Sequence, residues 1–463
     1  MNIIECLNDK KLLGQFIKDP ATWKAWFVFL KAFFGLPYSG DEELKIYREC
    51  TGRTRWPKPG RADEAWLICG TRSGKTNIVS LIGIFLSIFV KYDDVLSDGE
   101  RGVLIIVSPT KKQSKIIKKY LSTFFKQNDF FRPYLSKDTG EEIELTNGID
   151  IAVLTNDYRT VRGHSAIGCV IDETAFLGLE DFSTKPDTEI LRALRSRTLT
   201  TGGPTISLSS AYAKRGVMYE VFKRHFGEED SNILVWKAPS SRMNPLLDQK
   251  RIDRLRELDP EGTRTDFDCE FRDDVSDFIS RDIVEDCIIP DRYELPPNYA
   301  ASYKAFTDPS GGRRDSMTLA IAHSERDVQV LDLLIERRPP FNPDEVTQEF
   351  SQVLRQYGIT TVSGDKYAGE WPASRFQAHG ITYKVSEWTK NEIYTNLLPL
   401  LTGKRCELLD NKRLISQLCN LERRTARSGK DSIDHTPGGH DDVCNAAAGA
   451  LVTLGTRKMA GVW

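Results

Sequence analysis

The most constraining feature of this sequence is a short glycine-rich segment between an apolar strand and an apolar helical stretch. We expect the strand at 65–69, and the helical run extends over 78–90. The segment between them reads Gly70-Thr71-Arg72-Ser73-Gly74-Lys75-Thr76. Such a loop directs backbone N–H groups and the amino end of a helix toward phosphate oxygens. The sequence therefore predicts a phosphate-binding loop, in which Lys75 neutralises β- and γ-phosphate charge and the Thr76 hydroxyl binds Mg²⁺.

The match to the usual pattern G-x-x-x-x-G-K-[ST] is imperfect, because Cys69 stands where the first glycine belongs. A glycine-rich turn with a solvated lysine is the alternative interpretation. A G-K-T triplet between a strand and a helix favours phosphate binding over that alternative. Arg72 is a candidate for contact with the γ-phosphate, and an outward-facing position in the loop is the equal alternative.

A second signal follows further along the chain, where the apolar segment 169–171 ends in Asp172 and Glu173. Asp172 suits Mg²⁺ binding through water, and Glu173 suits polarising the attacking water. An acidic turn after an ordinary strand is common, but the pair together with the loop is specific. Arg162 and the segment 209–211 are further candidates for contact with the γ-phosphate, and surface positions are their plainer interpretation.

The order of elements indicates a two-domain α/β chain. Its 463 residues exceed the roughly 100–200 of a typical domain. From about 62 to 212, short apolar strands alternate with helical stretches, which predicts a mainly parallel sheet covered by helices. We expect a helical segment at 1–60, a phosphate-loop ATPase core of the RecA type at 61–240, a charged linker or lid at 241–297 and a second domain at 298–463.

Composition narrows the setting of the protein. Lys and Arg number 64 against 66 Asp and Glu, a net charge of −2, so any nucleic-acid site must be local. Nine cysteines without a C-x-x-C pair argue against a zinc ribbon and suit reduced thiols in a cytosol. The sequence after Met1 does not resemble a signal peptide, and the apolar run 78–90 is shorter than the ~20 residues that cross a bilayer. We therefore expect a soluble intracellular protein.

After residue 300 the pattern changes to three successive strands followed by alternating helices and strands. The expected strands are 303–307, 317–323, 328–336, 360–363, 381–385 and 406–409, and the expected helices are 343–357, 391–402 and an alanine-rich one from about 441. Three antiparallel strands followed by this alternation predict an RNase H-like nuclease domain.

Four aspartates occupy informative places in this second domain. Asp308 ends the first strand, Asp365 follows the fourth, and Asp441 and Asp442 precede the last helix. In an RNase H-like sheet these positions converge, and like charges that close are costly unless cations bridge them. The arrangement predicts Mg²⁺ or Mn²⁺, with two ions able to activate water and stabilise the leaving oxygen in phosphodiester cleavage.

Plainer interpretations apply to each of these residues alone. A single aspartate is more often a cap or turn residue, as Asp441 would be at a helix start. Asp315 and Asp434 are auxiliary or structural acids, and His435 and His440 join a metal site or lie at the surface. A basic group would hold DNA phosphates or form a solvated helix face: Lys412, Arg413, Arg423, Arg424, Arg427 and Lys430. The run of lysines at 111–119 has the same two interpretations.

These residues together resemble the large terminase subunit of tailed bacteriophages, the ATP-driven motor that fills procapsids with DNA. The likeness spans nearly the whole chain, although no single motif is specific. Its motifs are the segments 23–37, 51–53, 70–76, 161–163, 170–173 and 209–211, then Asp308, Asp365 and the segment 433–442. Terminases commonly carry an arginine four positions before the loop lysine; here Thr71 holds that place and Arg72 comes one later.

The resemblance implies an ATPase centre at Lys75, Thr76, Asp172 and Glu173. It also implies an endonuclease centre at Asp308, Asp365 and one or both of Asp441 and Asp442, which cuts concatemers of double-stranded DNA. The implied partners are a small terminase subunit, the portal protein of the procapsid and other copies of the chain in a ring, in the cytoplasm of the bacterial host. A repair helicase–nuclease is the alternative, but 213–297 is too short and strand-poor for a second motor domain.

Overall fold

This computed structural model describes residues 1–155, 165–177, 187–272, 275–313, 315–365, 371–425, 431–436 and 439–455. The chain divides into two compact units, with the boundary at residues 273 and 274. Each unit has its own sheet and its own hydrophobic core. We call them the first and the second unit below.

The first unit is built on an eight-stranded sheet with the strand order β3-β4-β5-β2-β6-β7-β1-β8. Every neighbouring pair from β5 to β8 is parallel, whereas β3, β4 and β5 form an antiparallel meander at one edge. The strands are β1 (Glu64–Cys69), β2 (Gly102–Ser108), β3 (Leu135–Asp138), β4 (Glu142–Leu145), β5 (Ile149–Thr155), β6 (Ser165–Asp172), β7 (Thr205–Ser209) and β8 (Ile233–Ala238).

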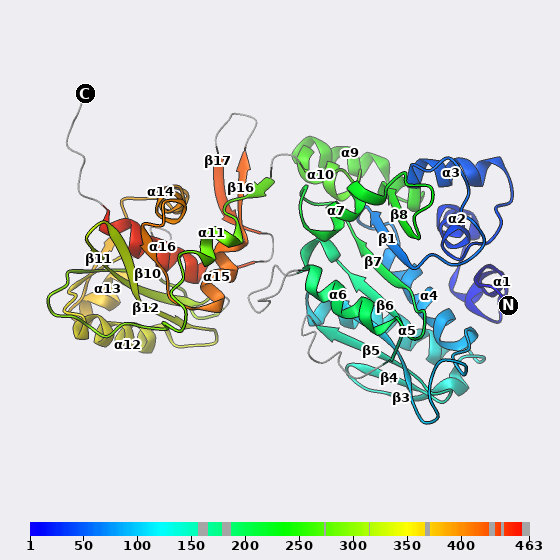
Figure 1. The fold of residues 1–463 in the computed structure, drawn as a ribbon, viewed down its shortest axis with the longest axis horizontal. Coiled ribbons are helices and arrows are strands. Elements are labelled where there is room, and N and C mark those ends of the chain that lie inside the picture. Colours follow the sequence, from blue (N-terminus) through cyan, green and yellow to red (C-terminus); the bar gives the residue numbers. More distant parts are fainter. Residues whose placement is uncertain are drawn as a thin grey trace. The chain divides into compact units, whose positions relative to one another are not determined.

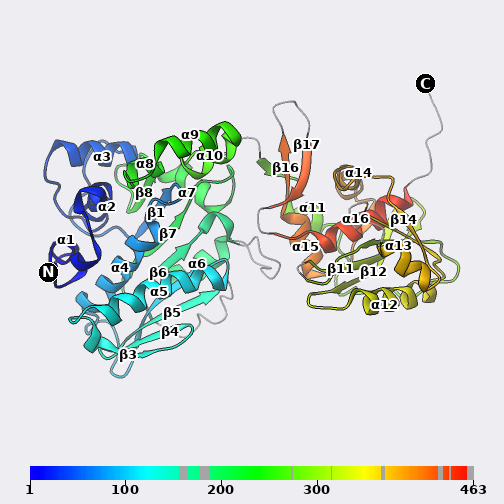
Figure 2. The ribbon, with the colours of Figure 1, turned by 180° about the vertical axis from the view of Figure 1, so that it is seen from behind.

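Helices cover both faces of this sheet (Figures 1 and 2). Alternate residues of β1 serve the two faces: Ala65 and Leu67 pack with α2, α4 and α5, and Trp66 and Ile68 pack with α6 and α7. The helices of the unit are α1 (Ile3–Asn8), α2 (Lys24–Phe33), α3 (Asp41–Thr51), α4 (Lys75–Phe89), α5 (Lys111–Gln127), α6 (Asp187–Arg197), α7 (Gly216–His225), α8 (Ser240–Met243), α9 (Gln249–Leu258) and α10 (Pro260–Asp266). Short 3₁₀ helices lie at Leu13–Phe16, Pro20–Trp23, Arg132–Tyr134 and Thr174–Phe176.

The second unit contains a six-stranded sheet with the order β14-β13-β10-β11-β12-β15. The pairs β10–β11 and β11–β12 are antiparallel, and β10–β13, β13–β14 and β12–β15 are parallel. The strands are β10 (Tyr303–Asp308), β11 (Met317–Glu325), β12 (Val328–Arg337), β13 (Thr361–Gly364), β14 (Thr382–Val385) and β15 (Cys406–Glu407). This is the RNase H-like topology that the sequence predicts.

Two helical layers sandwich the second sheet. Phe306 and Leu331 face α14, α15 and α16, and Ala305 and Leu319 face α12 and α13. A separate three-stranded antiparallel sheet has the order β17-β16-β9. The remaining elements are α11 (Arg281–Glu285), α12 (Pro343–Gln356), α13 (Trp371–Ala378), α14 (Lys390–Thr402), α15 (Lys412–Cys419), α16 (Asp442–Leu454), β9 (Val275–Asp277), β16 (Leu421–Thr425) and β17 (Asp431–His435).

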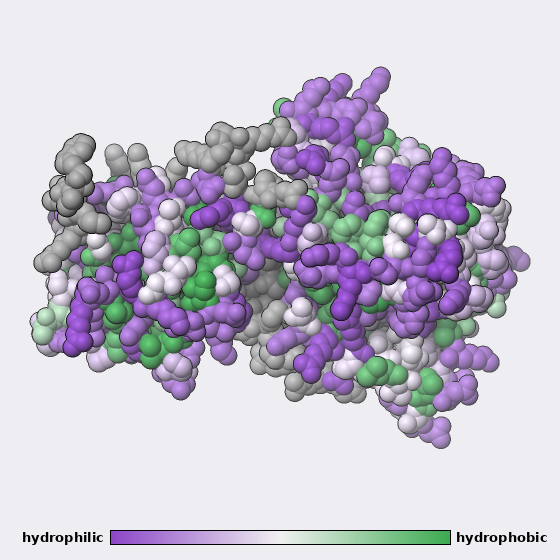
Figure 3. All heavy atoms as spheres, turned by 45° about the horizontal axis from the view of Figure 1, so that its top comes forward, coloured by the Kyte–Doolittle hydropathy of each residue, from purple (hydrophilic) through white to green (hydrophobic). Residues whose placement is uncertain are grey.

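The fold class expected from the sequence is confirmed: a mainly parallel α/β unit carries the phosphate loop, and an RNase H-like unit follows it. The stretch 241–297, expected to be a linker or lid, holds α9 and α10 of the first unit and β9 and α11 of the second. On the face shown in Figure 3, hydrophobic residues occur only in scattered patches. Among the described residues, every helix is too short or too polar to span a bilayer.

Candidate active sites

The glycine-rich loop joins the carboxyl end of β1 to the amino end of α4. Gly74 has φ +97° and Arg72 has φ +64°, so the chain turns through left-handed conformations before the helix begins. No side chain caps the first turn of α4. The backbone N–H groups of that turn are therefore available to an anion.

Lys75 is buried at the first position of α4, and its ammonium points back into the loop. Nζ donates hydrogen bonds to the carbonyl oxygens of Cys69, at 2.5 Å, and Gly70, at 3.1 Å. The Ser73 hydroxyl is buried in the same loop and has no partner among the described residues. A cation and an unpaired hydroxyl facing an uncapped helix start form a donor set that suits phosphate oxygens.

Neighbouring elements hold this loop in place. The Trp26 indole N–H on α2 donates to the Ser73 carbonyl at 2.9 Å, and Asn244 donates to the Arg72 carbonyl at 2.9 Å. The Ser240 hydroxyl donates to the Thr71 carbonyl at 2.7 Å. A side chain at Gly70 would collide with Ser240 and with the backbone that precedes Asp268, so this glycine serves close packing. Sequence analysis missed these supports because they come from segments far from the loop.

Two carboxylates lie at the end of β6. Asp172 is buried, and burial together with the nearby Glu173 charge raises its pKa to about 7, although Lys75 opposes the shift. The backbone N–H of Glu173 donates to Asp172 Oδ1 at 3.1 Å, and Glu173 itself has φ +48°. The Ser209 hydroxyl at the end of β7 donates to Glu173 Oε2 at 3.1 Å. The expected acids and the segment 209–211 therefore meet in one place.

Strand order brings the acids and the loop to one edge of the sheet. Strand β7 lies between β6 and β1 and is parallel to both, so Asp172 and the loop are about two strand spacings apart, roughly 10 Å. The carboxyl ends of parallel strands are where an α/β sheet binds ligands. Arg72 is exposed, Thr76 is partly exposed, and Arg162 lies outside the described residues.

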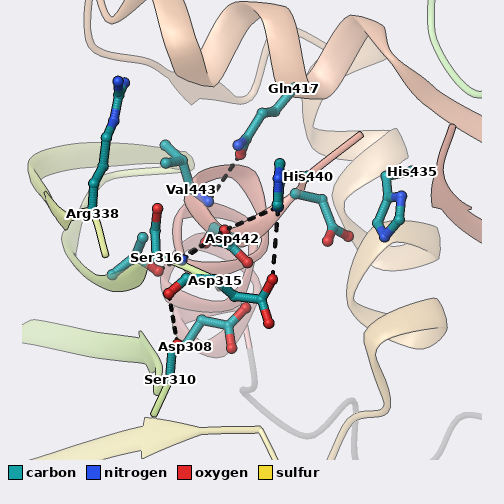
Figure 4. A network of polar contacts seen from close by, with 12 residues as sticks. Asp308, Ser310, Asp315, Ser316, Arg338, Gln417, His435, His440, Asp442 and Val443 are labelled. Atoms are coloured by element: carbon teal, nitrogen blue, oxygen red, sulfur yellow. Dashed lines mark hydrogen bonds and ion pairs between the residues drawn. The ribbon is translucent and has the colours of Figure 1, made fainter. Parts of the chain in front are cut away.

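The second unit holds an open acidic cavity of about 450 Å³ at the start of α16. The four expected aspartates, Asp308, Asp365, Asp441 and Asp442, all line it, together with Asp315, Lys390, His435, Gly439, His440 and Asn445. Figure 4 shows Asp308, Asp315 and Asp442 gathered at the first turn of α16 beside His440. Residues that are far apart in sequence therefore converge, as an RNase H-like arrangement requires.

Asp308 sits at the end of β10, where the chain leaves the sheet. Burial raises its pKa to about 8, and the charges of Asp442, Asp441 and Asp365 add to the shift. The Asn445 side chain on α16 opposes it by donating to Asp308 Oδ2 at 2.8 Å. A carboxyl held among three others in this way is a position where a divalent cation would be stabilising.

Asp441 and Asp442 have different surroundings, although they are neighbours. Burial and Asp441 raise the pKa of Asp442 to about 6, against the effect of His440, whose Nδ1 lies 3.9 Å from Asp442 Oδ2. Asp441 Oδ2 accepts a hydrogen bond from the Tyr394 hydroxyl at 2.8 Å and pairs with Lys390 Nζ at 2.6 Å. Asp442 thus faces the other acids with His440 beside it, whereas Asp441 is neutralised by a lysine.

The basic residues expected around this cavity are largely engaged with acids. Arg413 pairs with Glu336 at 2.9 Å, Arg424 pairs with the buried Glu422 at 3.1 Å, and Arg423 lies 3.5 Å from Asp431. Arg423 and Arg424 belong to the β16–β17 hairpin, so a helix face is the wrong description of that segment. Arg427 and Lys430 lie outside the described residues.

The lysine run begins α5, as its helical spacing predicts, and the side chains of Lys111 and Lys112 are not described. Lys118 pairs with Asp138. All nine cysteines are free thiols.

Comparison with protein-family models gives no match, and comparison with curated proteins gives none either. The structures that this chain resembles are bacteriophage large terminases. The HK97 large terminase is 17% identical over 93% of this chain and 99% of its own, with a TM-score of 0.41. The large terminase of a thermophilic bacteriophage is 12% identical over 94% of this chain and 98% of its own, also at 0.41. The magnesium-bound terminase nuclease of thermophilic phage G20c is 18% identical over 37% of this chain and 96% of its own, at 0.33.

Proposed function

We propose that this chain is the large terminase subunit of a tailed bacteriophage, which hydrolyses ATP to move double-stranded DNA into a procapsid and cuts the DNA with a metal-dependent endonuclease. The observation that carries the proposal is the pairing of two sites in one chain. The first unit presents Lys75, Asp172 and Glu173 at one sheet edge, and the second gathers Asp308, Asp365 and Asp442 in one cavity. The order of motifs in the sequence supports the same proposal.

In the first unit, Lys75, Ser73 and the backbone of the α4 start would hold the phosphates of ATP, with Thr76 and Asp172 toward its Mg²⁺. Bound MgATP supplies the γ-phosphoryl group and the charge that stabilises its transfer. Glu173 polarises the attacking water, and the Ser209 hydroxyl fixes the direction of its carboxylate. Asp172 is best placed to act as an anion, because a Mg²⁺ ion nearby would oppose the burial that raises its pKa.

In the second unit, Asp308, Asp365 and Asp442 would hold Mg²⁺ or Mn²⁺, because carboxylate oxygens are the ligands that these cations prefer. Bound cations supply an activated water and stabilise the leaving oxygen of a phosphodiester. Asn445 orients the Asp308 carboxylate through its 2.8 Å hydrogen bond. The cavity is open enough to admit a nucleic-acid backbone at its acidic floor.

A repair helicase–nuclease remains the alternative function and is not favoured. A helicase usually closes a second motor domain over its nucleotide. Between residue 213 and the start of the second sheet, the described residues supply mostly helices and the strands β8 and β9. The motor proposal also implies the partners of packaging: a small terminase subunit, the portal and further copies of this chain, in the host cytoplasm.

The test separates the two centres in the full chain. Lys75→Ala should abolish DNA-stimulated ATP hydrolysis while metal-dependent cleavage persists, and Asp308→Asn should do the reverse. Glu173→Gln should retain ATP binding and lose hydrolysis, which distinguishes the water-polarising role from phosphate binding. ATP turnover that survives Lys75→Ala, or cutting that survives Asp308→Asn, would overturn the corresponding assignment. Packaging of DNA into procapsids by the wild-type chain, with both variants inactive, would establish the motor.

A further inference from the structure

A group of metal-ligating side chains lies beside the acidic cavity, apart from the Asp308–Asp365–Asp442 set. One ligand atom from each of Asp434, His435 and Asp441 lies within 4.8 Å of the other two. Atoms that share a transition-metal ion at about 2.0–2.2 Å each must lie at such separations from one another. The spacing therefore accommodates a cation without a rearrangement of the backbone.

The protein already places a positive charge at this position. Lys390, the first residue of α14, has its Nζ 2.7 Å from Asp434 Oδ1 and 2.6 Å from Asp441 Oδ2. Although burial opposes the shift, the two carboxylates raise the pKa of Lys390 above its ordinary value. The ammonium thus stands between two of the three candidate ligands and neutralises them.

The third candidate ligand is oriented for coordination. His435 Nδ1 lies 2.8 Å from the carbonyl oxygen of Thr436, an acceptor only, so Nδ1 carries the proton. The lone pair of the neutral ring is then on Nε2, which lies 3.9 Å from Asp434 Oδ1. Two electron-rich atoms facing each other at that distance repel unless a cation lies between them. A backbone carbonyl that fixes the tautomer in this way is the usual second partner of a metal-bound histidine.

We propose that Asp434, His435 and Asp441 form a second cation subsite that takes a transition-metal dication of the Mn²⁺ class in exchange for the Lys390 ammonium. A set of one imidazole and two carboxylates favours Mn²⁺, Co²⁺ or Zn²⁺ over Mg²⁺, which prefers oxygen ligands alone. Asp441 lines the acidic cavity, so the subsite borders the proposed nuclease centre. Only the use of the ion in cleavage rests on the proposed function; binding itself does not.

The experiment measures binding to the full chain without nucleotide and does not depend on cleavage. Pulsed electron paramagnetic resonance of bound Mn²⁺ reports directly coordinated nitrogen through the ¹⁴N modulation. The modulation should be present in the wild type and in the Asp308→Asn variant, in which the nuclease centre is disabled. It should be lost in His435→Gln and retained in His440→Gln, the matched control whose histidine lines the same cavity.

Lys390 supplies a second measurement that does not require His435 to change. Lys390→Met removes the competing ammonium, so Mn²⁺ should bind this subsite about tenfold more tightly, whereas Lys390→Arg keeps the charge and the wild-type affinity. Modulation that persists in His435→Gln, or is absent from the wild type, would overturn the proposal. So would unchanged or weaker Mn²⁺ affinity in Lys390→Met. Loss of cleavage in Asp308→Asn with the modulation intact would leave this proposal standing and support the proposed nuclease centre as well.

Discussion

The side-chain oxygen of Gln417 accepts a hydrogen bond of 2.9 Å from the backbone N–H of Val443, at the start of α16 (Figure 4). The same oxygen accepts a second bond of 2.9 Å from the next N–H, that of Cys444. Asp441, the residue at the cap position, makes no such bond to the helix. Because Gln417 on α15 satisfies these N–H groups, the carboxylates of Asp441 and Asp442 remain available to the cavity.

Removal of this cap should therefore weaken the nuclease centre. In Gln417→Leu the freed N–H groups would attract the carboxylates of Asp441 and Asp442, so we expect metal-dependent cleavage to fall about tenfold and the metal concentration for half-maximal activity to rise. Gln417→Glu keeps an acceptor oxygen and should recover most of the affinity for metal. Equal loss in both variants would show that Gln417 serves packing alone. ATP hydrolysis is the internal control.

Ser209 should control the rate of ATP hydrolysis rather than the binding of ATP. Its hydroxyl donates to Glu173 Oε2 at 3.1 Å, so Ser209→Ala leaves the proposed water-polarising carboxylate free to turn. We expect kcat to fall about tenfold with little change in KM. Ser207→Ala is the matched control, because Ser207 lies in the same strand with a buried hydroxyl that has no partner among the described residues. A comparable kcat in the two variants would remove Ser209 from the mechanism.

The sequence allowed the strands that carry the acids to be predicted, because their apolar runs and following aspartates are local features. Asp308 and Asp365 were expected at the ends of their strands, and β10 and β13 do end there. Contacts between distant segments could not be predicted in this way. Gln417 caps a helix that begins 25 residues later in the chain, and Trp26 holds a loop that lies 47 residues away. Nothing in the local pattern of either residue announces such a partner.

Where local patterns were weak, the elements themselves were missed. The antiparallel meander of β3, β4 and β5 consists of short strands, two of them with only four residues. The β16–β17 hairpin is rich in arginine, which suggests a solvated helix face, but its first strand buries Glu422 beneath Arg424. Strand pairing and a buried ion pair override the intrinsic preference of such a segment.

Metal binding to the acidic cavity should strengthen as the pH rises. The pKa values of Asp308 and Asp442 are raised to about 8 and about 6, so both carboxyls are largely protonated at pH 5 and become ligands only as the pH approaches 8. Titration calorimetry with Mg²⁺ should show proton release on binding near pH 7 and increasing affinity from pH 6 to pH 8. Asp308→Asn should reduce the released protons and the affinity together. Affinity that is independent of pH would contradict the shared burial of these acids.

The same shift predicts how Asp308 affects stability. A carboxyl whose folded pKa lies above its unfolded value of 3.8 destabilises the fold as the pH rises from about 4 to about 8, and the full effect is present above pH 8. Without divalent metal at pH 8, Asp308→Asn should therefore raise the unfolding temperature of the second unit by several degrees. In excess Mg²⁺ the wild type should recover that difference, because the ion stabilises only the folded carboxylate cluster. Thermal unfolding with and without metal measures both effects.

Gly449 should be essential for the seat of α16 on the sheet. A side chain there would overlap the ring of Phe306 on β10, two residues before Asp308, so Gly449→Ala must push the helix away from the strand. Overpacking of this kind costs about 1–3 kcal/mol, which lowers the melting temperature of a unit this size by roughly 2–10 °C. Nuclease activity should fall further than stability, because Asp442 moves with the helix, while ATP hydrolysis is retained. Gly455→Ala, at the end of the same helix where the added methyl meets only an ordinary contact at 3.5 Å, should change neither property. Equal melting temperatures for the two variants would show that the helix and strand can separate without cost.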